Sequence, residues 1–123
     1  MKAGFAAVSI AAAIAWGVLL YVSVQAVAAM GFAAAGDVFL GDFGHPWRAQ
    51  FGADFTIHLL GVATWMIWRS RSLVAGIVCA ILAINCGALF TIPYLLWAVW
   101  TAGGDVAAAL TGARFRANPA AAE

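Results

Sequence analysis

Apolar residues form three long segments in this chain, and charged residues are confined to the connections between them and to the two ends of the chain. The segments cover residues 3–30, 55–68 and 73–104, and none contains Asp, Glu, Lys or Arg. The middle segment is too short to cross a membrane, since a transmembrane helix needs about 20 residues. If its helix begins at Pro46, which suits a first turn, residues 46–68 span about 34 Å. The pattern predicts an all-α integral membrane bundle of three transmembrane helices, at about 3–30, 46–68 and 73–101.

Composition supports this assignment. Hydrophobic residues make up 66% of the 123-residue chain and charged residues only 9%, whereas an ordinary globular domain has about 25% charged residues. The net charge of +1 does not indicate a nucleic-acid surface. The first apolar segment exceeds the core of a signal peptide, which has about 7–15 residues, so we expect a retained helix. These features predict one multi-pass domain of the cell membrane over residues 1–123, with an extramembrane, partly disordered tail at 102–123.

Basic residues suggest an orientation for the three helices. Arg69 and Arg71 lie in the short turn between the second and third helices, and Trp65 precedes them as part of an interfacial belt. Because cytoplasmic connections are enriched in Lys and Arg, this turn is expected in the cytoplasm together with the N-terminus. With three crossings, the connection at 36–48 and the C-terminal tail then lie outside.

Small residues recur at intervals of four along the first and third helices. In the third helix they are Ala75, Cys79, Ala83, Gly87 and Thr91. Membrane helices pack through such strips because lipid removes the hydrophobic drive between helices. The strip predicts contact with another helix of the chain, with a second copy in a homo-oligomer, or with a larger membrane complex. Its cysteines have no metal-ligand spacing, so no metal site is predicted.

Two further signals concern the end of the chain. Pro93 removes the intrahelical bond to the Leu89 carbonyl, so we expect a kink there and a neighbouring donor or a water for that carbonyl. Asp105 precedes residues 106–110, which predicts a short capped surface helix, followed by disorder.

The candidate functional residues are Asp54 and His58, four apart within a helix that otherwise avoids charge. Ionisable residues in a membrane helix are costly unless they face protein, water or each other, so they mark a functional site by default. The pair could also be structural, tying its helix to Gln25, Asn85 or Thr91. As a ligand site, Asp54, His58, Asn85 and Trp65 would form the polar end of an apolar cavity for a lipid-like molecule such as a quinone or isoprenoid.

Other functions remain open for this pair. Asp54 and His58 are the candidate catalytic residues if the protein is a membrane-embedded enzyme, in which they would act as an acid/base pair on an isoprenoid-like substrate. The third alternative is an accessory subunit of a larger membrane complex. A metal site that adds His45 is disfavoured, because His45 lies in a Gly-rich connection. The sequence favours a binding or accessory subunit and indicates no cofactor; the expected partners are membrane lipid, a second copy or a larger complex, and not nucleic acid.

The stretch 46–97 also resembles a domain-of-unknown-function family of small three-helix bacterial inner-membrane proteins. The resemblance rests on Pro46, Phe51 and Asp54 at the start of the second helix, and on the run Gly87-Ala-Leu-Phe-Thr-Ile-Pro93 in the third. The family has no established activity, so the resemblance implies the fold and not a mechanism.

Overall fold

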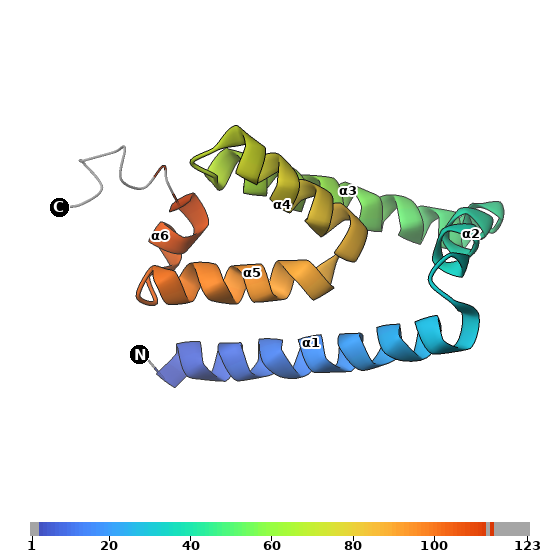
Figure 1. The fold of residues 1–123 in the computed structure, drawn as a ribbon, viewed down its shortest axis with the longest axis horizontal. Helices are drawn as coiled ribbons and strands as arrows, with labels where there is room; N and C mark the ends of the chain where they lie inside the picture. Colours follow the sequence, from blue (N-terminus) through green and yellow to red (C-terminus); the bar gives the residue numbers. More distant parts are fainter. Residues whose placement is uncertain (1–2, 113, 115–123) are drawn as a thin grey trace.

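The computed structural model describes residues 3–112 and 114, and these residues form helices with no strand (Figure 1). In chain order, the helices are α1 (Ala3–Met30), α2 (Ala34–Gly41), the 3₁₀ helix η1 (Asp42–Gly44), α3 (Pro46–Arg69), α4 (Leu73–Cys86), α5 (Ala88–Thr101) and α6 (Val106–Thr111). The all-helical prediction is confirmed, as are the ranges of the first two predicted helices to within one residue.

α1 is apolar around its whole circumference. In the described part of the chain, one helix is both long and apolar enough to cross a membrane, at Gly4–Met30; a signal sequence would satisfy the same criterion. α3 has 24 residues and is about 36 Å long, but it carries Arg48, Gln50, Asp54 and His58. α3 is therefore long enough to cross a membrane, but these polar residues lower its mean hydropathy.

α3 and α4 form an antiparallel hairpin whose close contact depends on small residues. At Gly76 an added Cβ would lie 2.8 Å from Ile67 Cα and 3.2 Å from Ile67 O. The two backbones approach here because neither helix places a side chain between them. The buried residues of this contact are Ala63 and Met66 on α3, and Gly76, Ala80 and Ala83 on α4.

The buried face of α4 corrects the predicted small-residue strip. Ala83 is fully buried, as expected, but Ala75 is exposed and Cys79 only partly buried. The packed face runs instead through Gly76, Ala80 and Ala83. Several neighbouring rows of α4 consist of small residues, so spacing alone did not distinguish the row that faces α3.

The predicted third helix is not continuous, which is the main correction to the sequence analysis. Gly87 ends α4 and begins α5 with φ +55° and ψ −132°. An L-residue rarely adopts this backbone conformation, whereas glycine has no Cβ to oppose it. The chain reverses at this hinge, so that α5 runs back along the molecule between α1 and the α3–α4 hairpin (Figure 1).

Pro93 lies inside α5, and the carbonyl that it frees finds a donor on α1. The indole Nε1 of Trp16 donates a hydrogen bond to Leu89 O at 2.9 Å. The expectation of a neighbouring donor is therefore confirmed. This bond joins the first long helix to the returning arm of the hinge.

The reversal at Gly87 also determines which helix ends lie close together. Arg69 Nε donates to Ala109 O of α6 at 2.6 Å, and a cavity joins Gly4 and Phe5 of α1 to the turn before α6. The start of α1, the turn at residues 70–72 and α6 thus share one end of the molecule, which we call the arginine end. The prediction that the tail begins opposite the basic turn is wrong, because α4 and α5 leave and return at the same end.

α6 forms as the sequence predicts. Asp105 accepts a hydrogen bond from Ala108 N at 3.0 Å and so caps the helix, which extends to Thr111. The disorder predicted beyond it falls largely on residues outside the described part of the chain.

Candidate functional site

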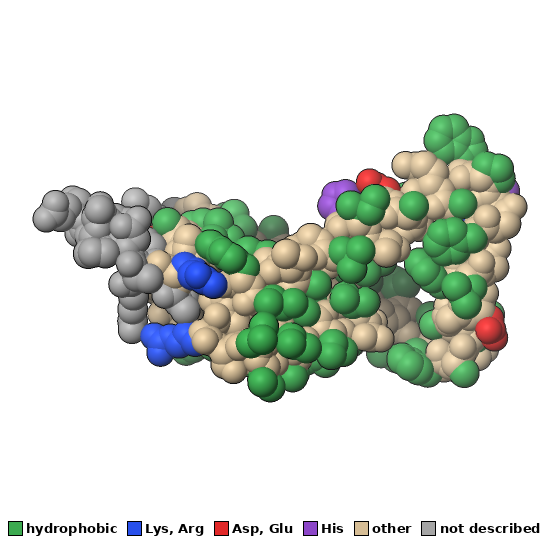
Figure 2. Space-filling view, turned by 90° about the horizontal axis from the view of Figure 1, so that it is seen from above, with side chains coloured by type: hydrophobic (Ala, Val, Ile, Leu, Met, Phe, Trp, Pro, Cys, Tyr) green, Lys and Arg blue, Asp and Glu red, His purple; other side chains and the backbone are tan. Residues whose placement is uncertain are grey.

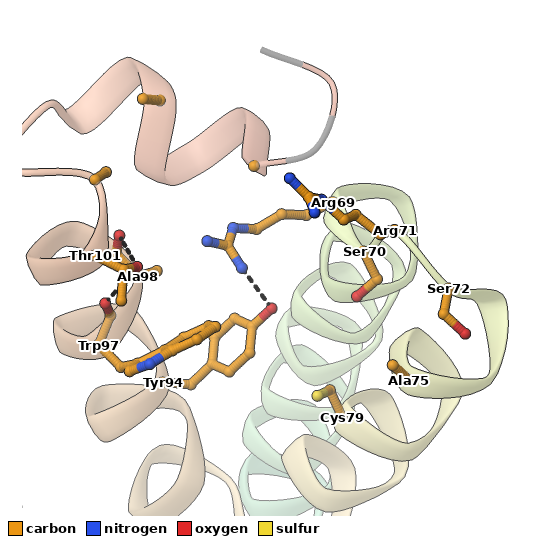
Figure 3. A pocket seen from close by; sticks show the side chains of 13 residues that line it. Arg69, Ser70, Arg71, Ser72, Ala75, Cys79, Tyr94, Trp97, Ala98 and Thr101 are labelled. Atoms are coloured by element: carbon orange, nitrogen blue, oxygen red, sulfur yellow. Dashed lines mark hydrogen bonds between the residues drawn. The ribbon is translucent and has the colours of Figure 1, made fainter. Parts of the chain in front are cut away.

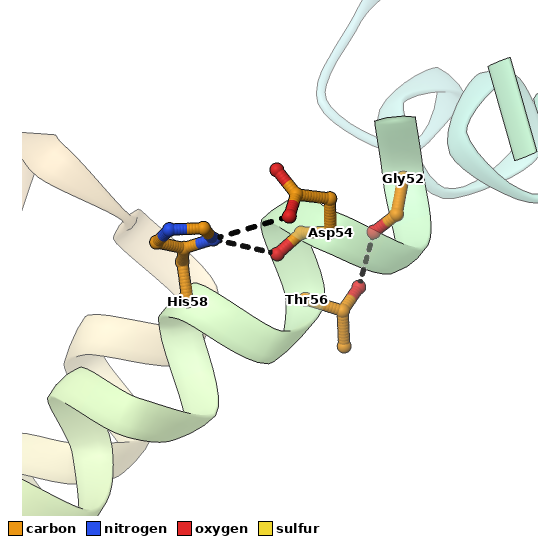
Figure 4. A network of polar contacts seen from close by, with 4 residues as sticks. All are labelled: Gly52, Asp54, Thr56 and His58. Carbon is orange, nitrogen blue, oxygen red and sulfur yellow. Dashed lines mark hydrogen bonds and ion pairs between the residues drawn. The ribbon is translucent and has the colours of Figure 1, made fainter. Parts of the chain in front are cut away.

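Asp54 and His58 lie on one face of α3, as their spacing predicts (Figure 4). His58 Nδ1 is 3.8 Å from Asp54 Oδ1 and 2.8 Å from Asp54 O, so a protonated Nδ1 donates chiefly to the backbone carbonyl. The Asp54 side chain is 59% exposed and the His58 side chain 74% exposed. The pair is assembled, but it faces away from the other helices instead of lining a cavity between them.

The polar residues proposed as neighbours do not join this pair. Asn85 Nδ2 donates to Ile81 O of its own helix, and Thr91 Oγ1 donates to Gly87 O. Gln25 is exposed on α1. No hydrogen bond in the described chain links Asp54 or His58 to α1, α4 or α5, so the structural tie between helices is not formed there.

Trp65, the fourth predicted ligand residue, belongs to a different cluster around Arg69. The guanidinium carbon of Arg69 lies 5.8 Å from the Trp65 ring centroid, 5.2 Å from that of Tyr94 and 5.9 Å from that of Trp97. Arg69 Nη1 also donates to the Tyr94 hydroxyl at 2.7 Å. Cation–π contacts of this kind attract a guanidinium to aromatic rings, so residues from α3 and α5 fix this side chain.

α6 completes the cluster from the third side. Besides the bond from Arg69 to Ala109 O, Trp65 Nε1 donates to Leu110 O at 3.0 Å. These carbonyls belong to the last turn of α6, where they lack intrahelical partners and carry the negative end of the helix dipole. Gly112 closes the helix so tightly that an added Cβ would lie 2.6 Å from Arg69 Cγ. Arg69 therefore holds α6 against α3 and α5.

A cavity of about 420 Å³ opens beside this cluster (Figure 3). It lies between the α3–α4 turn, α5 and α6. Its floor is apolar or small, whereas its rim carries arginines and hydroxyl groups. The lining residues are Arg69, Ser70, Arg71, Ser72, Ala75, Cys79, Tyr94, Trp97, Ala98, Thr101, Ala102, Ala108 and Gly112.

A second, smaller cavity of about 300 Å³ lies at the opposite end, where α2 and η1 meet α3. Its walls are mainly aromatic, and Arg48 Nη1 pairs with Asp42 Oδ1 at 2.9 Å on its rim. The arginine of this end is therefore neutralised by a carboxylate. The described residues contain no group of three His, Cys, Asp or Glu side chains placed to hold a metal ion.

Arg69 was predicted only to mark the orientation of the chain and not to belong to a site. Trp65 and Arg69 are one helical turn apart, as are Tyr94 and Trp97, and this spacing was visible. The reversal at Gly87 that brings the two pairs together was not visible in the sequence.

Comparison with protein-family models, with curated proteins and with solved structures finds no match to this chain.

Proposed function

We propose that this protein is a small integral membrane protein in which α1 and α3 cross the bilayer and α4–α5 form a re-entrant hairpin. Large apolar side chains are exposed along α1, α4 and α5, and soluble monomers rarely expose such continuous apolar surface. The buried hydrophobic side chains of the described residues are one methionine and five alanines. This core is too small to account for the fold in water, so lipid or partner helices cover the apolar faces.

The distribution of arginines supports an orientation. Arg69, Arg71 and Arg114 lie at or next to the arginine end, and Figure 2 shows arginine side chains, drawn in blue, there on the face drawn. Arg48 lies at the opposite end and is paired with Asp42. By the positive-inside tendency, the arginine end with α6 is cytoplasmic and α2 is outside.

Within this arrangement the protein acts as a binding subunit for a lipid-like ligand. The observation that carries this proposal is the cavity beside Arg69, where a basic rim meets an apolar floor. Ligand sites typically combine an apolar wall with a few polar groups that fix orientation. An amphiphile could place its polar end at the arginines and its chain along α4 and α5. Extraction of the purified protein should yield a co-purifying lipid-like molecule, and its absence from detergent-purified protein would contradict the binding role.

The arrangement predicts which positions react with a membrane-impermeant thiol reagent in intact cells. In a chain with Cys79 and Cys86 replaced by alanine, a cysteine at Gly44 should react, whereas cysteines at Ser72 and Ala107 should react only after lysis. All three positions are exposed.

Labelling at these three positions distinguishes the re-entrant hairpin from three full membrane crossings. Three full crossings would place Ala107 with Gly44 and opposite Ser72, which would contradict the re-entrant hairpin. Recovery of the protein in the soluble fraction would contradict the membrane proposal altogether.

The enzyme alternative rests on a different observation, the adjacency of Asp54 and His58 on an accessible face. Asp54→Asn and His58→Gln keep size and hydrogen-bonding capacity but remove proton transfer. If the pair performs acid/base chemistry, each variant should lose the cellular role, scored by complementation of a deletion strain, at unchanged membrane abundance and thermal stability. If both variants complement fully, the catalytic role is excluded; joint loss of abundance and complementation would indicate a structural role.

A further inference from the structure

No carboxylate of the described residues lines the cavity beside Arg69. Arg69 and Arg71 both line the cavity, and none of its lining residues is Asp or Glu. The two ion pairs of the described residues, Arg48–Asp42 and His58–Asp54, lie elsewhere on α2–α3. A cavity with two arginines and no acid favours an anionic ligand.

Arg69 is oriented so that part of its donor edge remains available. Its Nε and Nη1 groups donate to Ala109 O and to the Tyr94 hydroxyl, respectively. In the part of the chain that the structure describes, Nη2 makes no hydrogen bond. In Figure 3 the guanidinium extends from α3 into the space in front of α5. Because a planar guanidinium held in place loses little entropy on binding, it suits recognition of phosphate or carboxylate oxygens.

The first turn of α4 adds backbone donors to the same cavity. Ser72 is the N-cap of α4 but its side chain makes no capping hydrogen bond. The first intrahelical bond is from Gly76 N to Ser72 O, which leaves the N–H groups of residues 73–75 without intrahelical partners. Ser72 and Ala75 both line the cavity. Arg69 and Arg71 line the same cavity, and a helix N-terminus favours a negative ligand.

We propose that this cavity binds the phosphate-bearing anionic headgroup of a membrane lipid, with Arg69 and Arg71 contacting the phosphate and the acyl chains lying against α4 and α5. This inference rests on the proposed membrane function, because it is the bilayer that presents lipid headgroups at the depth of the 70–72 turn. A carboxylate ligand would fit one guanidinium equally well. Phosphate fits the whole site better, because its several oxygens match two arginines and the α4 N–H groups together.

The test uses the full-length protein in a neutral maltoside detergent. The probes are short-chain phosphatidic acid, short-chain phosphatidylcholine and inorganic phosphate, each titrated while thermal unfolding and tryptophan fluorescence are recorded. Trp97 lines the cavity, so occupancy should change its emission. Phosphatidic acid should raise the unfolding temperature and bind at least tenfold more tightly than phosphatidylcholine, whose choline cancels the phosphate charge.

Two arginine variants locate the site. Arg71→Gln should weaken phosphatidic acid binding about tenfold without changing the unfolding temperature of the free protein, because the exposed Arg71 makes no hydrogen bond in the described chain. Arg48→Gln at the other end is the matched control and should bind normally. Equal effects of the two variants, or equal binding of phosphatidic acid and phosphatidylcholine, would overturn the proposal.

Titration with inorganic phosphate distinguishes a lipid headgroup from a soluble phosphate ligand. Weak binding of phosphate alone, abolished by Arg71→Gln, supports a lipid whose chains supply the remaining affinity. Phosphate binding as tight as that of phosphatidic acid would overturn the lipid assignment and leave a soluble phosphate ligand. Thiol labelling at Gly44, Ser72 and Ala107 is independent of these titrations, so failure of lipid binding is distinguishable from failure of the membrane arrangement.

Discussion

Replacing Gly76 with alanine should destabilise the protein by about 1–3 kcal/mol, the usual cost of overpacking a close contact. The new Cβ would lie 2.8 Å from Ile67 Cα, a backbone atom that cannot move without separating α3 from α4. The measurement is thermal or denaturant unfolding in detergent. Gly76→Leu should have a larger effect in the same direction.

Gly61→Ala is the matched control, because Gly61 lies inside α3 and an added Cβ would meet nothing within 4 Å. Alanine is favoured over glycine in a helix by about 1 kcal/mol, so this variant should be unchanged or more stable. A Gly76→Ala protein as stable as Gly61→Ala would mean that α3 and α4 do not pack as described.

Replacing Gly87 with alanine should also destabilise the fold, by about 1–3 kcal/mol, but for a different reason. Here space is not limiting, since the nearest atom to an added Cβ is Phe55 Cζ at 3.8 Å. The cost arises from φ +55°, which an L-residue rarely adopts. The variant therefore favours a straight helix over the hinge.

Straightening would move α6 away from Arg69, which gives a second readout. In the Gly87→Ala chain, a cysteine at Ala107 should become accessible to the impermeant reagent in intact cells. Gly17→Ala in α1 is the control, since Gly17 has ordinary helical geometry and open space around it. Unchanged stability and labelling in Gly87→Ala would contradict a hinge at this position.

Helix positions were predictable where sequence signals were local. Pro46 at the first turn of α3 and Asp105 at the cap of α6 both act within a few residues, and both were identified. α2 was not predicted, because its residues lie in a connection rich in glycine. An apolar run also does not show where the chain reverses its direction, so residues 73–101 were predicted as one helix although Gly87 divides them.

Length provided a signal for this reversal. A straight helix over residues 73–101 would be about 43 Å long, well beyond the roughly 30 Å of a hydrocarbon core. α4 and α5 have 14 residues each, or about 21 Å, which is too short to cross. An apolar run much longer than one crossing, with a glycine near its middle, is better interpreted as two arms.

The candidate site was predictable only in part, because its members come from three separate helices. Asp54 and His58 were found together since they are neighbours on one helix. Trp65 was predicted to belong to the same ligand site but contacts Arg69 and α6 instead. The contacts of Arg69 with Tyr94 and Ala109 follow from the hinge, so local spacing could not reveal them.

The hydrogen bond from Trp16 to Leu89 has a consequence for the order of biogenesis. Its two residues are 73 positions apart, so in the proposed membrane arrangement α1 is synthesised and inserted long before its partner exists. Until α1 and α5 meet, the carbonyl freed by Pro93 lacks this donor, and an unsatisfied carbonyl in hydrocarbon costs several kcal/mol. The returning arm is therefore completed by the earliest helix, and docking against α1 is the late, long-range step of assembly. A chain whose first helix is removed would insert the hinge but leave this step unfinished.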